Sequence, residues 1–321
     1  MTTINSKNRP LILLAGFWEN QVADMRERFP DADFKAVENE NISEYSADAL
    51  VSLTQTALDS LFTPSVLERC GSLRWVHASS AGIDEYLPHL DDTPFVLTCG
   101  RILQGPPVAD HAMALLLALT RRLPWAIRGV GPADMPRPTE LNGKQALVIG
   151  LGGIGMGIAE RAAAFGMRVN AVTENNAPIL SFVDNMYFSE HLVDCLPTAD
   201  VVFISAPLTP VTHKTFSTAA FAAMKDTAYL INVSRGPIVD TDALVAALDA
   251  DRFEGVGFDV TDPEPLPDDH PLKAFERVLI TPHYAGTTTN HQRRFELIDT
   301  NIRRFINGHP LVNTVDKTLG F

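Results

Sequence analysis

The sequence has few cysteines, no CxxC spacing and no long apolar run. Its three cysteines, Cys70, Cys99 and Cys195, are odd in number and far apart. That pattern speaks against a disulfide framework and a zinc site and fits a reducing cytoplasm. The longest apolar stretch, Met113–Leu119, is too short to span a bilayer. Because MTTINSKNRP also lacks the apolar segment of a signal peptide, we expect a cytoplasmic protein.

Basic residues are scarce as well. The 26 Lys and Arg against 39 Asp and Glu give a net charge of -13, which would repel nucleic acid and an anionic membrane surface. A single local arginine can still hold an anionic small molecule. Repeats and low-complexity segments are lacking, and 321 residues are many for one core, so we expect two domains.

The first hundred residues alternate short apolar runs with polar, helix-like segments, which predicts a small parallel α/β unit. We expect strands at Leu11–Ala15, Ala49–Leu53, Arg74–Ala78 and Phe95–Thr98. A long apolar helix is expected over Val108–Arg121, after two prolines that suit a helix start. The Gly- and Pro-rich segment Gly129–Pro138 is expected to be a loop.

A second and more regular series begins at Gln145. Its near-continuous apolar strands indicate a sheet buried on both faces, and therefore a doubly wound fold. The expected strands are Gln145–Ile149, Arg168–Thr173, Val201–Ser205, Ala228–Val233, Gly255–Val260 and Val278–Thr281. Helices are expected over Met156–Phe165, Thr241–Leu248 and Thr289–Ile306.

The motif VIGLGGIG, with Gly150, Gly152 and Gly155, follows an apolar strand and opens a helix. Glycine permits the tight turn and lets backbone N–H groups approach a pyrophosphate at the positive end of the helix. The alternative is a plain strand-to-helix turn. The strand, the helix and the following strand are all in place, so we interpret the motif as a dinucleotide site.

An acidic residue about 20 residues past such glycines binds the adenosine ribose of NAD. Glu174 lies in that window, with Thr173 at the alternative position. No Arg or Lys follows within residues 175–177, so a 2′-phosphate has no obvious partner. This favours NAD and leaves NADP possible. The alternative is that Glu174 is a solvated loop charge.

Three polar residues follow predicted strands: Arg235 in INVSRGPIVD, Glu264 in FDVTDPEPLP and His283 in LITPHYAG. A guanidinium suits bidentate binding of a carboxylate, and a carboxylate beside an imidazole favours the protonated ring. Together they are the groups needed to hold a 2-oxo acid and protonate its carbonyl. The alternatives are a surface arginine and two loop residues that never meet.

Two further positions are candidates for binding. Asp259 ends the strand GVGFDV and could accept hydrogen bonds from a nicotinamide carboxamide, or satisfy a nearby turn. Ser80, Ala81 and Gly82 follow a strand of the first domain. Their small-residue turn could offer backbone N–H groups to the substrate carboxylate.

The motifs VADHAMALLLAL, GLGGIG, INVSRGPIVD, FDVTDPEPLP and TPHYAG stand in this order across nearly the whole chain. With these motifs in this order, the chain resembles the D-isomer-specific 2-hydroxyacid dehydrogenases. LRWVHASSAGID and LTCGRILQGPPVADH look most like the glyoxylate/hydroxypyruvate reductase branch. The resemblance implies a Rossmann-type NAD(P)-binding domain, residues 101–286, inserted into a smaller flavodoxin-like α/β substrate domain, residues 1–100 and 287–321.

The resemblance also implies roles for particular residues. His283 would donate the proton with support from Glu264, and Arg235 would bind and orient the oxo acid. The expected substrate contacts are Ser80, Ala81, Gly82, Arg235 and His283. The expected cofactor contacts are Gly150, Gly152, Gly153, Ile154, Gly155, Thr173, Glu174, Ala206, Pro207, Val233, Ser234, Asp259, Ala285 and Gly286.

The reaction implied is reduction of a small 2-oxo acid to a D-2-hydroxy acid by NAD(P)H. Two rivals remain on this fold: an NAD-sensing scaffold resembling corepressors, and a phosphite-type dehydrogenase. Formate enzymes of similar fold pair their histidine with glutamine, so Glu264 argues against formate.

Three positions depart from the family pattern. Asp110 replaces a usual glutamate, Cys99 replaces a frequent asparagine, and the segment Leu123–Pro138 is short. Relatives commonly dimerise through that region of the cofactor domain, so the resemblance implies a homodimer. Candidates for lining the substrate side-chain pocket are Phe17, Trp18, Trp75, Arg101 and Tyr284.

Overall fold

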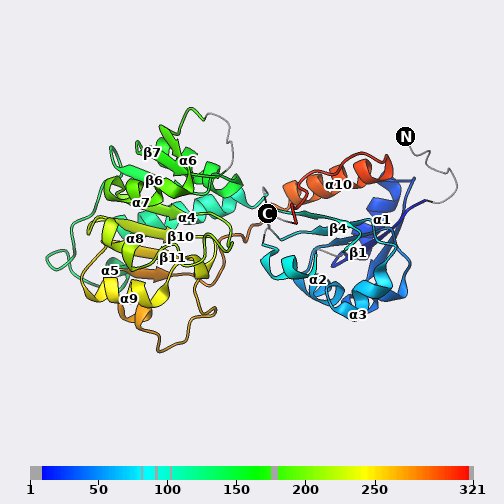
Figure 1. Ribbon diagram of the computed structural model, residues 1–321, viewed down its shortest axis with the longest axis horizontal. Helices are drawn as coiled ribbons and strands as arrows, with labels where there is room; N and C mark the ends of the chain where they lie inside the picture. Colours follow the sequence, from blue (N-terminus) through cyan, green and yellow to red (C-terminus); the bar gives the residue numbers. More distant parts are fainter. Residues whose placement is uncertain (1–8, 81, 91–92, 102, 175–179, 318–321) are drawn as a thin grey trace. The chain divides into compact units, whose positions relative to one another are not determined.

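The computed structural model describes residues 9–80, 82–90, 93–101, 103–174 and 180–317. They form two compact units. The first unit runs up to Leu103 and resumes at Thr289, and the second unit is Gln104–Thr288. Each unit is a parallel sheet with helices on both faces (Figure 1). The predicted fold class, two α/β domains with a Rossmann-type sheet in one of them, is confirmed.

The first unit has the strand order β2-β1-β3-β4-β5, which is the flavodoxin-like order. Its strands are β1 (Leu11–Ala15), β2 (Asp33–Val37), β3 (Ala49–Ser52), β4 (Trp75–Ala78) and β5 (Val96–Cys99). Its helices are α1 (Glu19–Arg28), α2 (Gln55–Leu61), α3 (Pro64–Leu67) and α10 (Gln292–Ile306). The α10 helix returns to this unit from the far end of the chain and packs its Ile298 and Ile302 with α1 on one face of the sheet, opposite α2.

The core of the first unit contains a buried imidazole. His77 on β4 is fully buried, and its Nδ1 lies 2.9 Å from Thr98 Oγ1. Its Nε2 has no hydrogen-bond partner among the described residues. Burial, and secondarily the charge of Arg294, lowers the pKa of His77 to about 4. The folded protein therefore holds this ring neutral.

This buried ring predicts an acid-sensitive stability. Unfolded, His77 takes up a proton near pH 6.5, whereas folded it does so only near pH 4. Its contribution is therefore complete above pH 6.5 and is lost as the pH falls toward 4, by roughly 1 kcal/mol per pH unit. Urea unfolding of the wild type and His77→Gln at pH 7, 6 and 5 measures this. The variant should show the smaller pH dependence, and identical slopes would contradict the assignment.

The second unit has the strand order β12-β11-β10-β9-β6-β7-β8. Its strands are β6 (Gln145–Ile149), β7 (Arg168–Val172), β8 (Asn185–Tyr187), β9 (Val201–Ile204), β10 (Tyr229–Asn232), β11 (Gly255–Phe258) and β12 (Val278–Ile280). Its helices are α4 (Gly105–Thr120), α5 (Leu123–Ile127), α6 (Gly153–Ala164), α7 (Leu192–Cys195), α8 (Thr218–Ala223) and α9 (Thr241–Asp249). The order reverses between β6 and β9, the point where doubly wound sheets bind ligands at the carboxyl ends of their strands.

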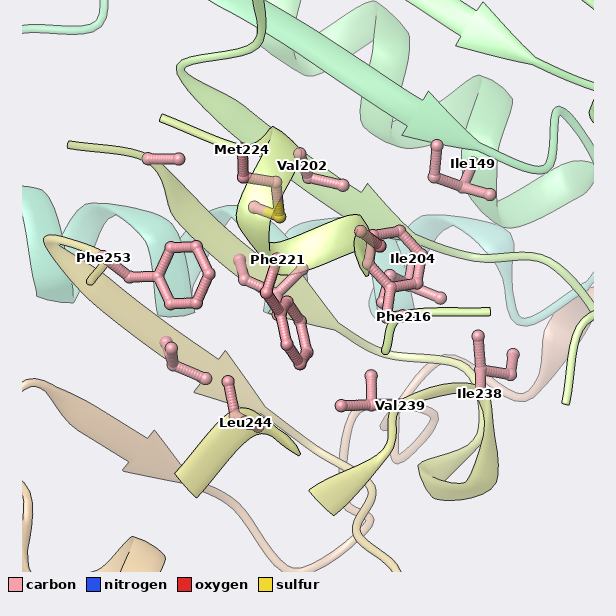
Figure 2. Packing of buried hydrophobic residues seen from close by; sticks show 14 of the residues in the cluster. Ile149, Val202, Ile204, Phe216, Phe221, Met224, Ile238, Val239, Leu244 and Phe253 are labelled. Carbon is pink, nitrogen blue, oxygen red and sulfur yellow. The ribbon is translucent and has the colours of Figure 1, made fainter. Parts of the chain in front are cut away.

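Apolar residues cover both faces of this sheet. One cluster packs α4 and α6 against it, and a second packs α7, α8 and α9 against the other face. Figure 2 shows the second cluster, where Phe221 of α8 lies near Phe216 and Phe253. The rings of Phe221 and Phe253 meet edge to face, with centroids 5.6 Å apart. Burial on both faces explains why these strands are nearly continuous apolar runs.

Several helices begin at residues other than those predicted. The α4 helix starts at Gly105 and includes Pro106 in its first turn, where a missing N–H is tolerated. The α6 helix starts inside the glycine motif, at Gly153, and α10 starts only at Gln292. In the part of the chain that the structure describes, no helix has both the length and the apolarity needed to cross a membrane.

Candidate active site

The loops after β6 and β9 meet at the reversal of strand order. Gly150 has φ +88°, and a Cβ built on it would lie 2.6 Å from Ala206 Cα. The Ser205 hydroxyl lies 3.0 Å from Ile149 O and 2.8 Å from Gly150 O. A Cβ on Gly155 would overlap Gly150 O. Glycine is therefore required at 150 and 155 so that α6 can pack close to the end of β6.

Gly152 differs from these two glycines. It stands at the N-cap of α6, and a Cβ built on it would meet no atom within 4 Å. The first-turn N–H groups and the positive end of the helix dipole face this end, which suits an anion. A pyrophosphate fits this glycine turn because the backbone can approach it without a side chain intervening. The described residues thus match the donor set that a dinucleotide needs.

The loop after β9 lies against this glycine turn, and the loop after β10 contacts the loop after β9. Ala206 and Pro207 follow β9, and Val233 and Ser234 follow β10. The Ser234 hydroxyl donates to Ala206 O, and both residues are buried. The predicted cofactor contacts of these two loops are therefore adjacent at the carboxyl ends of neighbouring strands.

The end of β7 carries Thr173 and Glu174. The Thr173 N–H donates to Tyr187 O at 2.9 Å. Glu174 Oε1 accepts the Ser189 N–H at 3.0 Å. The carboxylate is thus anchored beside the carboxyl end of β7, where the predicted ribose contact would lie. Residues 175–177, which contain no Arg or Lys that could bind a 2′-phosphate, lie outside the described residues.

Arg235 is held by an asparagine that the sequence did not single out. Asn232, the last residue of β10, is fully buried. Its Nδ2 donates to Arg235 O at 2.9 Å, and its Oδ1 accepts the Ser234 N–H at 3.0 Å. The half-buried Arg235 side chain donates from Nη1 to Ser234 O at 2.8 Å. Asn232 therefore fixes the backbone from which the guanidinium extends.

The turn carrying Arg235 packs directly on the turn carrying Glu264. A Cβ on Gly236 would overlap Thr261 O, so only glycine allows this approach. The Thr241 hydroxyl donates to Asp262 O at 2.8 Å and joins the same two segments. The backbones that carry the guanidinium and the carboxylate are thus held together at the ends of β10 and β11.

Glu264 and His283 form the central pair of the site. Glu264 Oε1 lies 2.6 Å from His283 Nδ1, and Glu264 Oε2 accepts the Thr261 N–H at 3.2 Å. Since an ionised carboxylate only accepts hydrogen bonds, Nδ1 carries the hydrogen. The His283 side chain is 51% exposed, so Nε2 is the ring nitrogen left to meet a substrate. The alternative in which His283 and Glu264 are loop residues that never meet is therefore wrong.

His283 has an uncommon backbone for a residue with a Cβ, with φ +52°. Its N–H donates to Asp259 O at 2.8 Å. The buried Asp259 side chain accepts the N–H groups of Tyr284 at 2.8 Å and Ala285 at 2.9 Å. Of the two roles predicted for Asp259, the structure thus contains the second, in which its side chain accepts hydrogen bonds from a nearby turn. The loop that holds His283 is attached to the end of β11.

Other predicted positions belong to the first unit. Ser80 and Gly82 follow β4 in the first unit, with the Ser80 hydroxyl 3.0 Å from Gly82 O, and Ala81 lies outside the described residues. The suggestion that Trp75 lines a pocket is wrong. It is fully buried, donates from Nε1 to Thr98 Oγ1 at 2.9 Å and packs on Phe305. Among the described His, Cys, Asp and Glu side chains, no group of three or more could hold a metal ion.

Fold and site together define a doubly wound, dinucleotide-binding α/β protein with an imidazole–carboxylate pair and an arginine at the carboxyl edge of its sheet. The sequence model of the "D-isomer specific 2-hydroxyacid dehydrogenase, NAD binding domain" matches residues 113–285. The chain therefore belongs to the D-isomer specific 2-hydroxyacid dehydrogenase family, a family of NAD(P)-dependent oxidoreductases. The predicted family, enzyme class and nicotinamide cofactor are confirmed.

Individual relatives agree with this assignment. The chain is 33% identical over 291 residues to a glyoxylate reductase of Thermofilum pendens, covering 84% of this chain and 81% of the relative. It is 31% identical over 261 residues to glyoxylate/hydroxypyruvate reductase B of Citrobacter koseri, with 78% of each covered. Among solved structures, the apo form of Rhodotorula graminis D-mandelate dehydrogenase matches with a TM-score of 0.81 and 25% identity, over 96% of this chain and 98% of that one.

Proposed function

We propose that the protein reduces a small 2-oxo acid to the D-2-hydroxy acid with NAD(P)H, in the cytoplasm. The observation that carries this is the 2.6 Å contact between His283 and Glu264 at the edge of an NAD-binding sheet. When bound, the reduced nicotinamide supplies the hydride that adds to the carbonyl carbon. The chain itself holds the acid, orients its carbonyl and delivers a proton to the carbonyl oxygen.

Each residue of the site has one part in this proposal. His283 Nε2 donates the proton, and Glu264 at Nδ1 stabilises the imidazolium before transfer. Arg235 binds the oxo acid and stabilises the negative charge that develops on its oxygen. Ser80 and Gly82 of the first unit would offer backbone N–H groups to the substrate carboxylate. Asp259, Ala285 and Gly286 would lie beside the nicotinamide.

Substrate size is best proposed from the relatives. Two of them are named glyoxylate reductase and glyoxylate/hydroxypyruvate reductase B, so we expect a short oxo acid with few carbons beyond the carbonyl, although another is named hydroxyphenylpyruvate reductase. The D-mandelate dehydrogenase among the structural neighbours is named for a larger, aromatic acid. Initial rates with glyoxylate, hydroxypyruvate, pyruvate, phenylpyruvate and longer oxo acids, each with NADH and NADPH, test the proposal.

The same assay separates the rivals. Oxidation of phosphite with NAD, in the absence of oxo-acid reduction, would replace the proposal with a phosphite dehydrogenase. Tight binding of NADH with no turnover of any oxo acid or phosphite would favour a nucleotide-sensing scaffold. Reduction of at least one short oxo acid to a product of D configuration supports the proposal.

The glycine turn provides a matched pair of variants. In Gly155→Ala the new Cβ would overlap Gly150 O, so we expect the free energy of unfolding to fall by about 1–3 kcal/mol. In Gly152→Ala the methyl group enters open space. Stability should then change little, while the Kd of NADH rises by about tenfold or more because the pyrophosphate loses its approach. Urea unfolding and NADH fluorescence titration measure the two effects, and equal nucleotide affinity in Gly152→Ala and wild type would remove the glycine turn from the cofactor site.

We also propose that the protein forms a homodimer through the second unit. On the short α5 helix, Leu123 is 47% exposed and Ile127 is 84% exposed. These residues are four apart, so both side chains lie on the same face of the helix. Exposed apolar faces of this kind favour association. Light scattering should give twice the monomer mass for the wild type and a shift toward monomer for Ile127→Asp, whereas a monomeric wild type would end this proposal.

A further inference from the structure

The Asp259 carboxylate is the centre of a buried network behind the His283 loop. It is 2% exposed. Besides the Tyr284 and Ala285 N–H groups, it contacts the Thr281 hydroxyl at 2.6 Å. His111 Nε2 lies 2.9 Å from the same hydroxyl and 3.4 Å from Asp259 Oδ1. One imidazole from α4 thus reaches the end of β11 through the residue that follows β12.

The hydrogen positions in this network follow from its geometry. Two backbone N–H groups donate to the Asp259 carboxylate, which therefore acts as the acceptor. The Thr281 hydroxyl must then donate its single hydrogen to that carboxylate. Its oxygen is left to accept from His111, so Nε2 of His111 carries a hydrogen. The relay runs from the imidazole through the hydroxyl to the carboxylate.

This relay acts on the backbone of His283. The left-handed conformation of that residue is unfavourable for a side chain with a Cβ, so its surroundings must hold it. Asp259 makes three of the contacts that hold it: its backbone oxygen accepts the His283 N–H, which Thr281 O also accepts, and its side chain accepts the next two N–H groups. A carboxylate free to rotate would release Tyr284 and Ala285. Fixing the Asp259 side chain therefore fixes the direction in which the His283 ring points.

The relay also connects two segments next to the boundaries between the units. The α4 helix begins at Gly105, one residue after the second unit starts, and the loop from Thr281 leads to its end at Thr288. His111 therefore ties the first helix of the second unit to its last segment.

We propose that His111 is a positioning residue for the proton donor: through Thr281 it holds the Asp259 carboxylate in the orientation that sets the His283 loop. This inference rests on the proposed role of His283 for its catalytic consequence. Its structural part, the restraint on residues 283–286, does not depend on any reaction.

Hydrogen exchange and kinetics together test it. In His111→Ala we expect deuterium uptake by peptides covering 283–286 to speed up about tenfold, with peptides from α9 unchanged. We expect kcat for the oxo acid to fall about tenfold, since a small misplacement of a catalytic group is costly. The Kd of NADH should rise by a smaller factor than kcat falls, because Asp259, Ala285 and Gly286 are also proposed cofactor contacts. His309→Ala, on the surface of the first unit, is the matched control and should leave all three quantities unchanged.

A double-mutant cycle excludes a merely structural effect. Thr281→Val removes the hydroxyl of the relay at nearly constant shape, so it should reproduce His111→Ala, and the double variant should lose no more than either single one. Thr281→Ser, which keeps the hydroxyl, should restore most of kcat. Unchanged exchange at 283–286, or losses that multiply, would overturn the proposal. A wild type inactive on every oxo acid would instead refute the proposed function, while the exchange data would still decide whether His111 holds the loop.

Discussion

His283→Ala is expected to lower kcat for 2-oxo acid reduction by roughly 10²- to 10⁴-fold, the usual contribution of a positioned general acid. The NADH Kd should stay within about twofold of wild type because the imidazole is proposed to act on the substrate oxygen. The side chain is 51% exposed, so its loss should disturb packing little. Steady-state rates and NADH fluorescence titration measure the two quantities separately.

Glu264→Gln is the matched control for this variant. The amide keeps the size of the side chain and a hydrogen bond to the ring, but it removes the charge that stabilises the imidazolium. Its kcat should therefore fall less than that of His283→Ala. Near-normal turnover by His283→Ala would exclude this histidine as the proton donor and with it the proposed mechanism.

The strands that the sequence did not reveal share a physical cause. Ten strands were predicted within one or two residues of their ends, and β2 and β8 were missed. Both are edge strands of their sheets. The burial of β2 alternates, and β8 has only three residues, of which Asn185 and Met186 are exposed. The edge strands β5 and β12 were predicted because their sequences are mostly apolar, whereas β2 and β8 have no continuous apolar run.

The sequence predicts the reactive residues of the site better than the residues that position them. Arg235, Glu264 and His283 each follow a predicted strand, and parallel strands bring such ends to one edge of a sheet. Of the residues that hold them, Asp259 was recognised from the sequence, but Asn232 and His111 were not. Asn232 lies only three residues before Arg235, but the hydrogen bond from its side chain to Arg235 O forms only in the folded turn. His111 lies 170 residues from Thr281, and only the folded sheet makes them neighbours.

Trp75 was proposed for the site but belongs to the core. This aromatic residue near a predicted binding loop was one of five candidates for lining the substrate pocket, but its position along β4 places it on the face covered by α10. The helix that covers it comes from the far end of the chain. Nothing near Trp75 in the sequence signals that partner, so a period-two pattern could not distinguish a pocket wall from a core.

Arg235→Ala is expected to raise the KM for the oxo acid and lower kcat/KM by about 10- to 100-fold, the range for losing a hydrogen-bonded charged group. The guanidinium is proposed to bind the carboxylate and carbonyl of the substrate at once. Its backbone is fixed independently by Asn232, so truncating the side chain should leave the turn in place. The Kd of NADH should remain near that of wild type.

Arg235→Lys separates charge from geometry. Lysine keeps the positive charge but loses the planar fork that suits a carboxylate, so we expect it to recover only a minor part of kcat/KM. A lysine variant as active as wild type would show that charge alone suffices, and the bidentate part of the proposal would be wrong. If Arg235→Ala instead weakens NADH and oxo acid equally, the guanidinium belongs to the cofactor site. In that case the substrate carboxylate must be held by other donors, and Ser80 and Gly82 of the first unit are the next residues to mutate.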